Sequence, residues 1–258
     1  MEKGIFVVID GIDGSGKATQ SRLLSERLVR EGKQVEKIDF PRYGTPLFGE
    51  LLGECLAGKR GDFLHLDPKI ASTLYALDRY EASSQINAWL EEGRVVIADR
   101  FASSNQIHQG GKIIDQAKRD AFLAWIDKME HEVLAVPRPS AVVYLRVPVE
   151  TSLALLSKER EAKNQHLGGE AQDVVEKDRM YLERSFESAE RLSTGTNWKT
   201  IECTDAGALR APADIHEDVY KAVATLLPDF SAESPRKNHA EVAIENLYQI
   251  FNLPYIIQ

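Results

Sequence analysis

Short apolar runs alternate with longer amphipathic stretches along most of this 258-residue chain. Continuous runs of this length are typical of strands buried on both faces, and they lie at 5–10, 34–40, 94–98, 141–147 and 198–203. Helical periodicity marks the stretches at about 17–30, 44–57, 67–92, 115–133 and 213–227. One further helix begins near 148, and another ends near 193. The alternation predicts β-α-β units, and therefore an α/β fold with a five-stranded parallel sheet flanked by helices.

Two segments depart from this alternation. From 157 to 174 the chain turns polar and charged, which predicts a mobile surface segment. From 228 to 238 Ser, Glu, Pro, Arg and Lys predominate, as in a linker, and apolar residues from 242 to 251 then fall on one helical face. We therefore expect one domain at 1–228, followed at 229–258 by a linker and a short amphipathic C-terminal helix. That helix packs on its own domain or on a twin subunit, or else binds another partner.

Composition narrows the classes of partner. The chain has 40 acidic and 32 basic residues, hence a net charge of −8, which argues against nonspecific binding to nucleic acid or to an anionic membrane. No run approaches the roughly 20 apolar residues of a membrane span. Cys55 and Cys203 lie far apart without a metal-ligand spacing, so we expect a reducing, cytoplasmic setting.

A glycine-rich segment directly after the first strand and directly before the first helix predicts a phosphate-binding loop. Its backbone N–H groups converge on phosphate oxygens, the helix N-terminus adds positive potential, and Lys17 reaches the outer phosphates. The residues expected to bind ATP through this loop are Gly11, Ile12, Asp13, Gly14, Ser15, Gly16, Lys17, Ala18 and Thr19. Because the chain as a whole is acidic, the positive potential that binds phosphate must come from the loop and its immediate neighbours.

One residue departs from the loop motif. Ala18 stands where a Ser or Thr would help to ligate Mg²⁺, and Thr19 is rotated by about 100° on the helix. Because Mg²⁺ keeps several waters and relies on substrate phosphates, a water can fill this position. We expect weakened metal binding with retained activity.

Two strand ends carry further candidates. Asp99 closes the third strand, where a carboxylate can hold Mg²⁺ directly or through its water shell, and Arg100 can offer a guanidinium fork to a phosphate. The segment Phe40-Pro41-Arg42 places a second Arg after the second strand. Two such arginines and a phosphate loop indicate a second phosphorylated substrate. The alternative for Asp99 and Arg100 is an ordinary ion pair.

At four places the sequence resembles the thymidylate kinase family, whose members transfer the ATP γ-phosphoryl group to thymidine monophosphate. The four are the loop at 11–20, Phe40-Pro41-Arg42, the stretch 75–81 and the stretch 99–110. The resemblance covers about 3–227. It implies a P-loop NTPase-type three-layer sandwich with the loop strand in the centre, a mobile lid at about 157–174, Mg²⁺ as cofactor and a homodimer.

Substrate contacts follow from the resemblance, position by position. It implies that Asp13 contacts the sugar 3′-hydroxyl, that Tyr75 stacks on thymine, that Arg79 bonds the base edge, and that Arg42 and Arg100 hold the acceptor phosphate. The remaining implied substrate-binding residues are Phe40, Pro41, Ser104, Asn105 and Gln109. Alternatively Tyr75 is a core residue, Arg79 a solvated charge, and Ser104, Asn105 and Gln109 polar turn residues. His108 stands where the family has an aromatic residue.

The charged segment matches the family's lid, which supplies a basic residue when the phosphate loop has none. Lys158, Arg160 and Lys163 are candidates, and we expect Arg160 to act, so the catalytic set is Lys17, Asp99, Arg100 and Arg160. Two rival functions stay open: a kinase of another nucleoside monophosphate or of a deoxynucleoside, and a nucleotide-binding regulatory module that has lost catalysis.

Overall fold

The computed structural model describes residues 3–44, 47–164 and 172–227. Its chain divides into a unit at Met1–Leu226 and a unit at Leu227–Gln258. The linker and C-terminal helix expected at 229–258 lie outside the described residues. The fold below is that of the first unit.

Five parallel strands form the central sheet, as the sequence predicts. They are β1 (Ile5–Asp10), β2 (Val35–Asp39), β3 (Val95–Asp99), β4 (Ala141–Arg146) and β5 (Trp198–Glu202), in the order β2-β3-β1-β4-β5. The central position of β1 brings the loop that follows it to the middle of the sheet's carboxyl edge. In α/β sheets ligands bind at this edge, where the strand order reverses.

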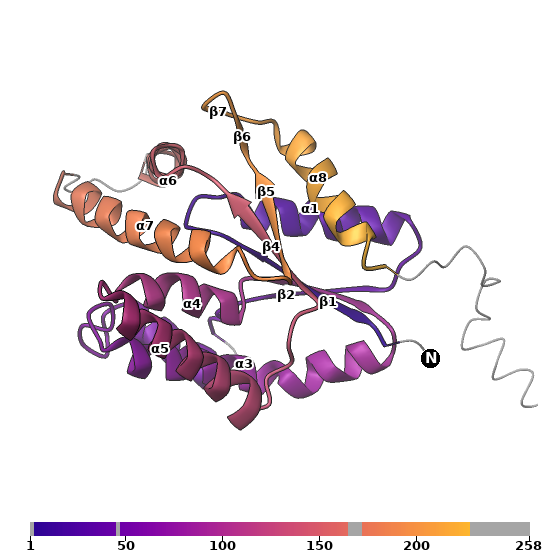
Figure 1. Ribbon diagram of the computed structural model, residues 1–258, viewed down its shortest axis with the longest axis horizontal. Coiled ribbons are helices and arrows are strands. Elements are labelled where there is room, and N and C mark those ends of the chain that lie inside the picture. Colours follow the sequence, from indigo (N-terminus) through magenta and orange to yellow (C-terminus); the bar gives the residue numbers. More distant parts are fainter. Residues whose placement is uncertain (1–2, 45–46, 165–171, 228–258) are drawn as a thin grey trace, which may run out of the picture. The chain divides into compact units, whose positions relative to one another are not determined.

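Helices cover both faces of the sheet, which makes the expected three layers. They are α1 (Lys17–Arg30), α2 (Leu47–Leu56), α3 (Pro68–Glu91), α4 (Ala102–Gly111), α5 (Gln116–Lys128), the π-helix η1 (Met129–Val133), α6 (Val149–Asn164), α7 (Gln172–Leu192) and α8 (Pro212–Ala224). Figure 1 shows α1 and α8 on one side of the sheet and α3, α4 and α5 on the other. No helix among the described residues is long and apolar enough to cross a membrane.

The core explains why the apolar runs become strands. Phe6 and Val8 on β1 are buried in a cluster that also contains Ala82 and Ile86 of α3. Because neighbouring residues of a strand point to opposite faces, β1 needs apolar residues at almost every position to face helices on both sides. The burial of Val7 and Ile9 on β1 completes this pattern.

The segment after Asp99 forms a helix that the sequence does not predict, which rules out the alternative that its polar residues belong to a turn. Ser104, Asn105 and Gln109 are not turn residues, because they lie on the helix α4. Its serines serve polar partners in the interior: Ser103 and Ser104 donate their hydroxyls to the buried Asp10 carboxylate. A helix that buries polar side chains lacks the apolar stripe by which helices are recognised in a sequence.

The lid region is also more regular than its composition predicts. The backbone is helical through Asn164 at the end of α6 and again from Gln172 at the start of α7. Residues 165–171 lie outside the described part of the chain. A small hairpin that the sequence does not predict, β6 (Thr204–Asp205) with β7 (Ala208–Leu209), follows β5.

Candidate functional site

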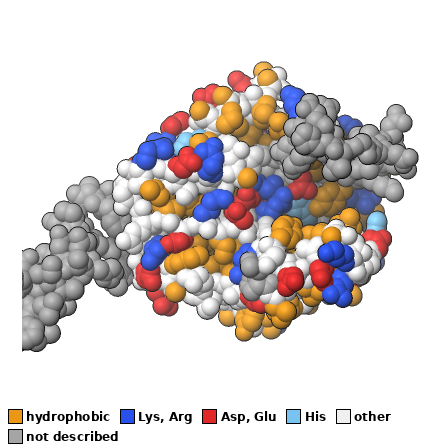
Figure 2. Space-filling view, turned by 180° about the vertical axis from the view of Figure 1, so that it is seen from behind, with side chains coloured by type: hydrophobic (Ala, Val, Ile, Leu, Met, Phe, Trp, Pro, Cys, Tyr) orange, Lys and Arg blue, Asp and Glu red, His pale blue; other side chains and the backbone are white. Residues whose placement is uncertain are grey.

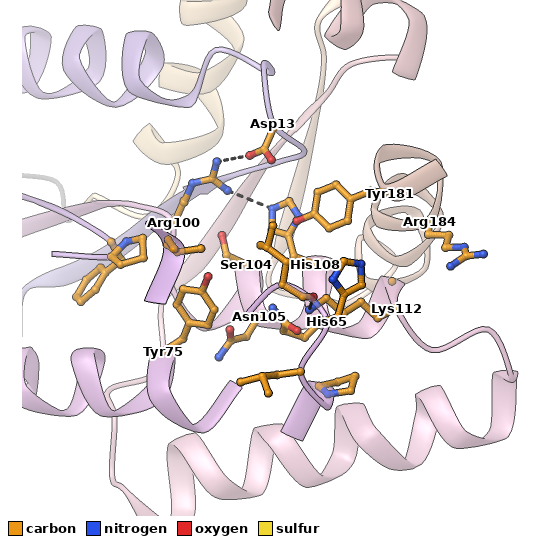
Figure 3. Close-up of a pocket in the computed structure, with 18 of the residues that line it drawn as sticks. Asp13, His65, Tyr75, Arg100, Ser104, Asn105, His108, Lys112, Tyr181 and Arg184 are labelled. Carbon is orange, nitrogen blue, oxygen red and sulfur yellow. Dashed lines mark hydrogen bonds and ion pairs between the residues drawn. The ribbon is translucent and has the colours of Figure 1, made fainter. Parts of the chain in front are cut away.

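A cavity of about 1010 Å³ opens at the carboxyl edge of the sheet. Its walls come from segments that are far apart in sequence: Asp13 after β1, Phe40 and Pro41 after β2, Tyr75 on α3 and Arg100 after β3. Figure 3 shows Asp13, Tyr75 and Arg100 with His108 of α4 and Tyr181 of α7 around one space. The volume suits a ligand of nucleotide size.

The phosphate loop is held in place by its glycines and by α6. Gly14 has φ 75° and Gly16 has φ 87°, values that L-residues rarely adopt. A Cβ at Gly14 would also lie 3.0 Å from the Ser152 carbonyl oxygen of α6. The Ser152 hydroxyl donates to the Asp13 carbonyl oxygen. The loop at 11–16 thus has the strand-to-helix setting that the sequence predicts.

Lys17 lies folded over its own loop. Its Nζ donates to the carbonyl oxygens of Ile12 at 2.8 Å and Gly11 at 3.2 Å, and the side chain is buried. Burial, and then repulsion from Arg100, lowers the pKa of Lys17 to about 8, against the attraction of nearby aspartates. A bound phosphate would replace neutral carbonyl partners with a charged one, which favours the protonated amine.

Asp10 joins the phosphate loop to α4. This fully buried carboxylate accepts hydrogen bonds from the Gly11 N–H at 2.8 Å and from the hydroxyls of Ser103 and Ser104. Sequence reasoning assigned Asp10 only to a strand. A carboxylate at the end of an apolar strand, before a glycine, was the available signal.

Arg100 lies at the centre of the site's electrostatics. Its guanidinium donates to the Asp13 carboxylate and, at 3.1 Å, approaches His108 Nε2. Burial raises the pKa of Asp13, but the neighbouring His108, Arg100 and Lys17 outweigh it and hold that pKa well below its usual range. Arg100 has φ 66°, a left-handed conformation that a non-glycine residue keeps only when its surroundings impose it.

Asp99 lies at the end of β3, in register with Asp39 at the end of β2. Burial raises the pKa of Asp99, and the charges of Asp39 and Asp10 add to this effect against Lys17 and Arg100. No group of three or more His, Cys, Asp or Glu residues that could hold a metal ion is found within the described part of the chain. Asp99 can therefore offer oxygen ligands to a metal that is also held by a ligand's own oxygens.

Tyr75, Arg79 and Asn105 line the cavity. The Arg79 guanidinium makes two hydrogen bonds of 2.6 Å to the Glu130 carboxylate, and both side chains are buried. Asn105 Nδ2 donates to the same carboxylate at 3.1 Å. Glu130 thus fixes the orientation of two polar residues that the sequence assigned to substrate binding. Arg79 is a buried, paired charge and not a solvated one.

Arg42 is placed differently from the other expected substrate residues. Phe40 and Pro41 line the cavity, whereas Arg42 is absent from its lining. Arg42 Nε donates to the Asp78 carboxylate at 2.9 Å, and Nη2 donates to the Asp78 carbonyl oxygen at 2.6 Å. The guanidinium therefore fastens the segment after β2 to α3 in this conformation.

His108 and Tyr181 form a contact that sequence reasoning did not find. The two rings stack at 5.6 Å with an interplanar angle of 12°, and the Tyr181 hydroxyl lies 2.8 Å from His108 Nδ1. Burial, chiefly, lowers the pKa of His108 to about 4, so the imidazole is neutral at physiological pH. Tyr181 and the equally unexpected Tyr43 both line the cavity. Tyr43 adjoins Phe40-Pro41-Arg42, which was its only sequence signal.

Of the three basic residues predicted in the lid, one has a described side chain. Lys158 lies exposed on α6. The side chains of Arg160 and Lys163 lie outside the described residues. Figure 2 shows Lys and Arg side chains interspersed with Asp and Glu over the described part of the visible face.

Comparison with known proteins gives a consistent picture. A family model described as thymidylate kinase matches residues 9–206. A thymidylate kinase of Mycobacterium tuberculosis (strain ATCC 25618 / H37Rv) is 30% identical over 218 residues, which cover 82% of this chain and 99% of the relative. A probable thymidylate kinase of Thermococcus gammatolerans is 29% identical over 225 residues, 85% of this chain and 96% of the relative. The human thymidylate kinase is 26% identical over 219 residues, 84% of this chain and 88% of the relative.

Proposed function

This chain belongs to the thymidylate kinase family, and we propose that it transfers the γ-phosphoryl group of ATP to thymidine monophosphate, giving ADP and thymidine diphosphate. One observation carries the proposal: the phosphate loop and a cavity of nucleotide size meet at Asp13 and Arg100. Two phosphorylated ligands can therefore face each other at one edge of the sheet.

ATP is assigned to the loop at 11–19. The N–H groups of the loop and the start of α1 point positive potential at its β- and γ-phosphates. Lys17 leaves the carbonyl oxygens of Gly11 and Ile12 to contact these phosphates. Ala18 offers no hydroxyl, so the outer phosphates depend more on Lys17 and on the lid.

Thymidine monophosphate is assigned to the cavity. Arg100 holds its phosphate, Asp13 accepts from the sugar 3′-hydroxyl, and Tyr75 stacks on the base, a contact worth about 1–3 kcal/mol. The base edge faces three polar residues: two that Glu130 orients by hydrogen bonds, and one with a side-chain oxygen that is unpaired within the described part of the chain. They are Arg79, Asn105 and Gln109, whose buried Oε1 makes no hydrogen bond among the described residues. Ser104, Phe40 and Pro41 complete the walls, and Arg42 supports them through Asp78.

In this reaction the protein has to align the two nucleotides and neutralise phosphate charge. An oxygen of the acceptor phosphate attacks the γ-phosphorus as the bond from that phosphorus to the β,γ-bridging oxygen breaks, and ADP leaves with the electron pair. Because the transition state is loose, the protein gains rate by aligning the two nucleotides and neutralising the transferring oxygens. Lys17 and Arg100 supply charge from the loop side and the acceptor side. We assign Arg160 to the transferring group from the lid.

Mg²⁺ fits this site if the protein and the bound nucleotide both supply ligands to the ion. Asp10 already accepts hydrogen bonds from three donors, so we assign the ion to Asp99, the other strand-end carboxylate beside Lys17. One carboxylate, contacting the ion directly or through a water, together with phosphate oxygens and waters is a common arrangement for Mg²⁺. The ion would neutralise phosphate charge and orient the outer phosphates.

The test is ADP release from the purified protein with ATP and Mg²⁺, offering thymidine, deoxyuridine, uridine, guanosine and adenosine monophosphates one at a time. We expect selective turnover of thymidine monophosphate. The Tyr75→Ala variant should lose acceptor affinity by about tenfold or more and keep its ATP affinity. Binding of ATP without turnover of any acceptor would refute the kinase assignment and favour a regulatory module.

We also propose that the protein is a cytoplasmic homodimer, with ATP and thymidine monophosphate as its ligands and neither nucleic acid nor membrane as a partner. The two free, buried cysteines and the acidic charge support this setting. Light scattering after size-exclusion chromatography measures the assembly, and a monomeric mass would contradict it.

A further inference from the structure

His108 has no part in the transfer chemistry, yet it lies between two residues of the acceptor site. Its Nε2 faces Arg100 Nη1 at 3.1 Å and its Nδ1 faces the Tyr181 hydroxyl at 2.8 Å. Arg100 in turn donates to Asp13. Figure 3 shows this row of side chains, Asp13, Arg100, His108 and Tyr181, all of which line the cavity.

The chemistry of arginine settles which ring nitrogen of His108 carries the proton. A guanidinium has five N–H donors and no acceptor, so His108 Nε2 must accept from Arg100. The neutral ring then carries its proton on Nδ1 and donates it to the Tyr181 oxygen. The alternative tautomer would place two donors against each other.

This tautomer also decides what Tyr181 offers to a ligand. Its oxygen already accepts from His108, so its own O–H is left to donate. The Ser185 hydroxyl lies close enough to Tyr181 to lower its pKa slightly, but Ser185 Oγ has no partner at hydrogen-bond distance among the described residues. Tyr181 lines the cavity, and burial keeps its pKa well above the usual range, so the O–H stays protonated.

We propose that His108 is a positioning residue which holds the Tyr181 hydroxyl as a hydrogen-bond donor into the cavity, where that hydroxyl reads an oxygen acceptor on the sugar or the base of the acceptor nucleotide. The inference rests on the proposed function. It adds a specificity-determining donor on α7 and a reason for a histidine at position 108. Because α7 packs along α4, the same contact ties α7 to the arginine that holds the acceptor phosphate.

Three variants separate this role from a structural one. Tyr181→Phe removes the donor alone, His108→Phe removes both polar contacts of the ring, and His108→Asn keeps an N–H near the position of Nδ1. We expect Tyr181→Phe and His108→Phe each to raise the KM for thymidine monophosphate about five- to tenfold with kcat changed less than twofold. His108→Asn should stay within about twofold of the parent KM. The double variant should resemble His108→Phe alone, because the two residues act on one bond.

A tyrosine outside the cavity provides the matched control. Tyr144 is buried and its hydroxyl donates to Glu190 at 3.3 Å. Tyr144→Phe should leave the KM for thymidine monophosphate unchanged. Additive effects of the His108 and Tyr181 variants, an unchanged KM in Tyr181→Phe, or no rescue by asparagine would each overturn the proposal.

Acceptor analogues identify the oxygen that is read. The 3′-deoxy, 2-thio and 4-thio forms of thymidine monophosphate each remove or weaken one acceptor. The KM penalty of Tyr181→Phe should disappear for one of them and persist for the others; persistence with all three would overturn the proposal. If the parent protein does not turn over thymidine monophosphate, the proposed function is wrong. If the parent is active but the variants keep its KM, only this inference is wrong.

Discussion

At the scale of single residues, the buried pair of Arg79 and Glu130 combines stability with recognition. Two hydrogen bonds of 2.6 Å join the side chains, which are 3% and 1% exposed. A buried charge is tolerable only when a partner of opposite charge satisfies it. The pair therefore serves the core and, through the remaining guanidinium N–H groups, the cavity.

Removal of Glu130 tests this double role. Glu130→Ala leaves Arg79 charged and unpaired, so we expect the free energy of unfolding to fall by about 3–5 kcal/mol in a urea titration. The exposed pair of Arg138 and Asp127 is the control, and Asp127→Ala should cost less than about 1 kcal/mol. Equal losses at the two sites would contradict the buried-pair account.

The neutral imidazole of His108 predicts acid sensitivity. Burial lowers its pKa from 6.5 to about 4, so between these values the unfolded chain binds a proton that the folded protein does not. Stability contributed by the neutral ring is present above pH 6.5 and is lost as the pH falls toward 4, by up to about 3 kcal/mol. His108→Asn should flatten the dependence of unfolding free energy on pH in this window. An unchanged pH dependence in His108→Asn would contradict the assignment of a neutral, buried ring.

The sequence indicated which side chains carry charge near the site, but it did not indicate which acidic residue each arginine pairs with. The sequence indicated that Arg42 and Arg79 are arginines near a cleft, and the acidic partners Asp78 and Glu130 decided what each does. Those partners come from other elements, 36 and 51 residues away. Only the folded chain brings them together, so the sequence could not tell that Arg42 would be held outside the cavity lining.

At the scale of elements, the phosphate loop is arranged so that ATP binding changes the protonation of Lys17. Lys17 has its pKa lowered to about 8, chiefly by burial, and its Nζ is held by neutral carbonyl oxygens. ATP phosphates would raise that pKa. At pH 8 about half of the Lys17 side chains are neutral, so ATP binding should take up about half a proton. Calorimetry in two buffers of different ionisation enthalpy measures this uptake.

The lysine itself provides the control for that measurement. Lys17→Arg keeps its charge at all accessible pH values, so ATP binding to this variant should take up no proton at pH 8. In the parent protein the uptake should also vanish at pH 6.5, where Lys17 is already protonated. Equal uptake at both pH values would contradict the assignment.

The contact between α4 and α7 depends on a glycine. A Cβ on Gly111 would lie 3.0 Å from the backbone of Arg184 and Ser185, with no flexible side chain to yield. Gly111→Ala should push α7 away, lower the unfolding free energy by about 1–3 kcal/mol and weaken binding of thymidine monophosphate, because Tyr181 moves with α7. Gly53→Ala on α2, where the new Cβ meets the Tyr43 ring at an ordinary contact distance of 3.7 Å, is the matched control for stability and should leave the unfolding free energy within about 1 kcal/mol of the parent. A stability loss without any loss of binding would separate α7 packing from the site.

Element prediction succeeded where periodicity was strong and failed where polarity hid it. The five strands of the sheet and the helices α1, α3 and α8 follow from apolar patterns and end signals, such as Asp67-Pro68 at the start of α3. The helix α4 does not, because its inward face carries the buried Ser103 and Asn105, and Ser104 also donates to an interior carboxylate. Their partners Asp10 and Glu130 make the buried polar face stable. Only the tertiary fold supplies those partners.

At the scale of the whole molecule, every residue assigned to the proposed site belongs to the unit at Met1–Leu226. The sheet, the phosphate loop and the cavity all fall between residues 5 and 202, and α8 packs against α1 to close the unit near residue 224. A chain ending at Leu227 should therefore fold. We expect it to release ADP with thymidine monophosphate within about twofold of the full chain.

The melting temperature decides what the residues after Leu227 contribute. Each kcal/mol of lost stability shifts the midpoint by about 2–4 °C in a domain of this size, so a truncated chain that melts within about 2 °C of the full chain has lost no core contact of consequence. Addition of thymidine monophosphate at 100 times its Kd should raise the stability of both chains by about 2.7 kcal/mol, because the ligand binds only the folded state. If the short chain melts lower but shows the same ligand-induced rise, residues 228–258 support the fold and not the site. If it melts normally and loses the rise, those residues belong to the acceptor site, and the assignment of that site to residues 13–184 alone is wrong.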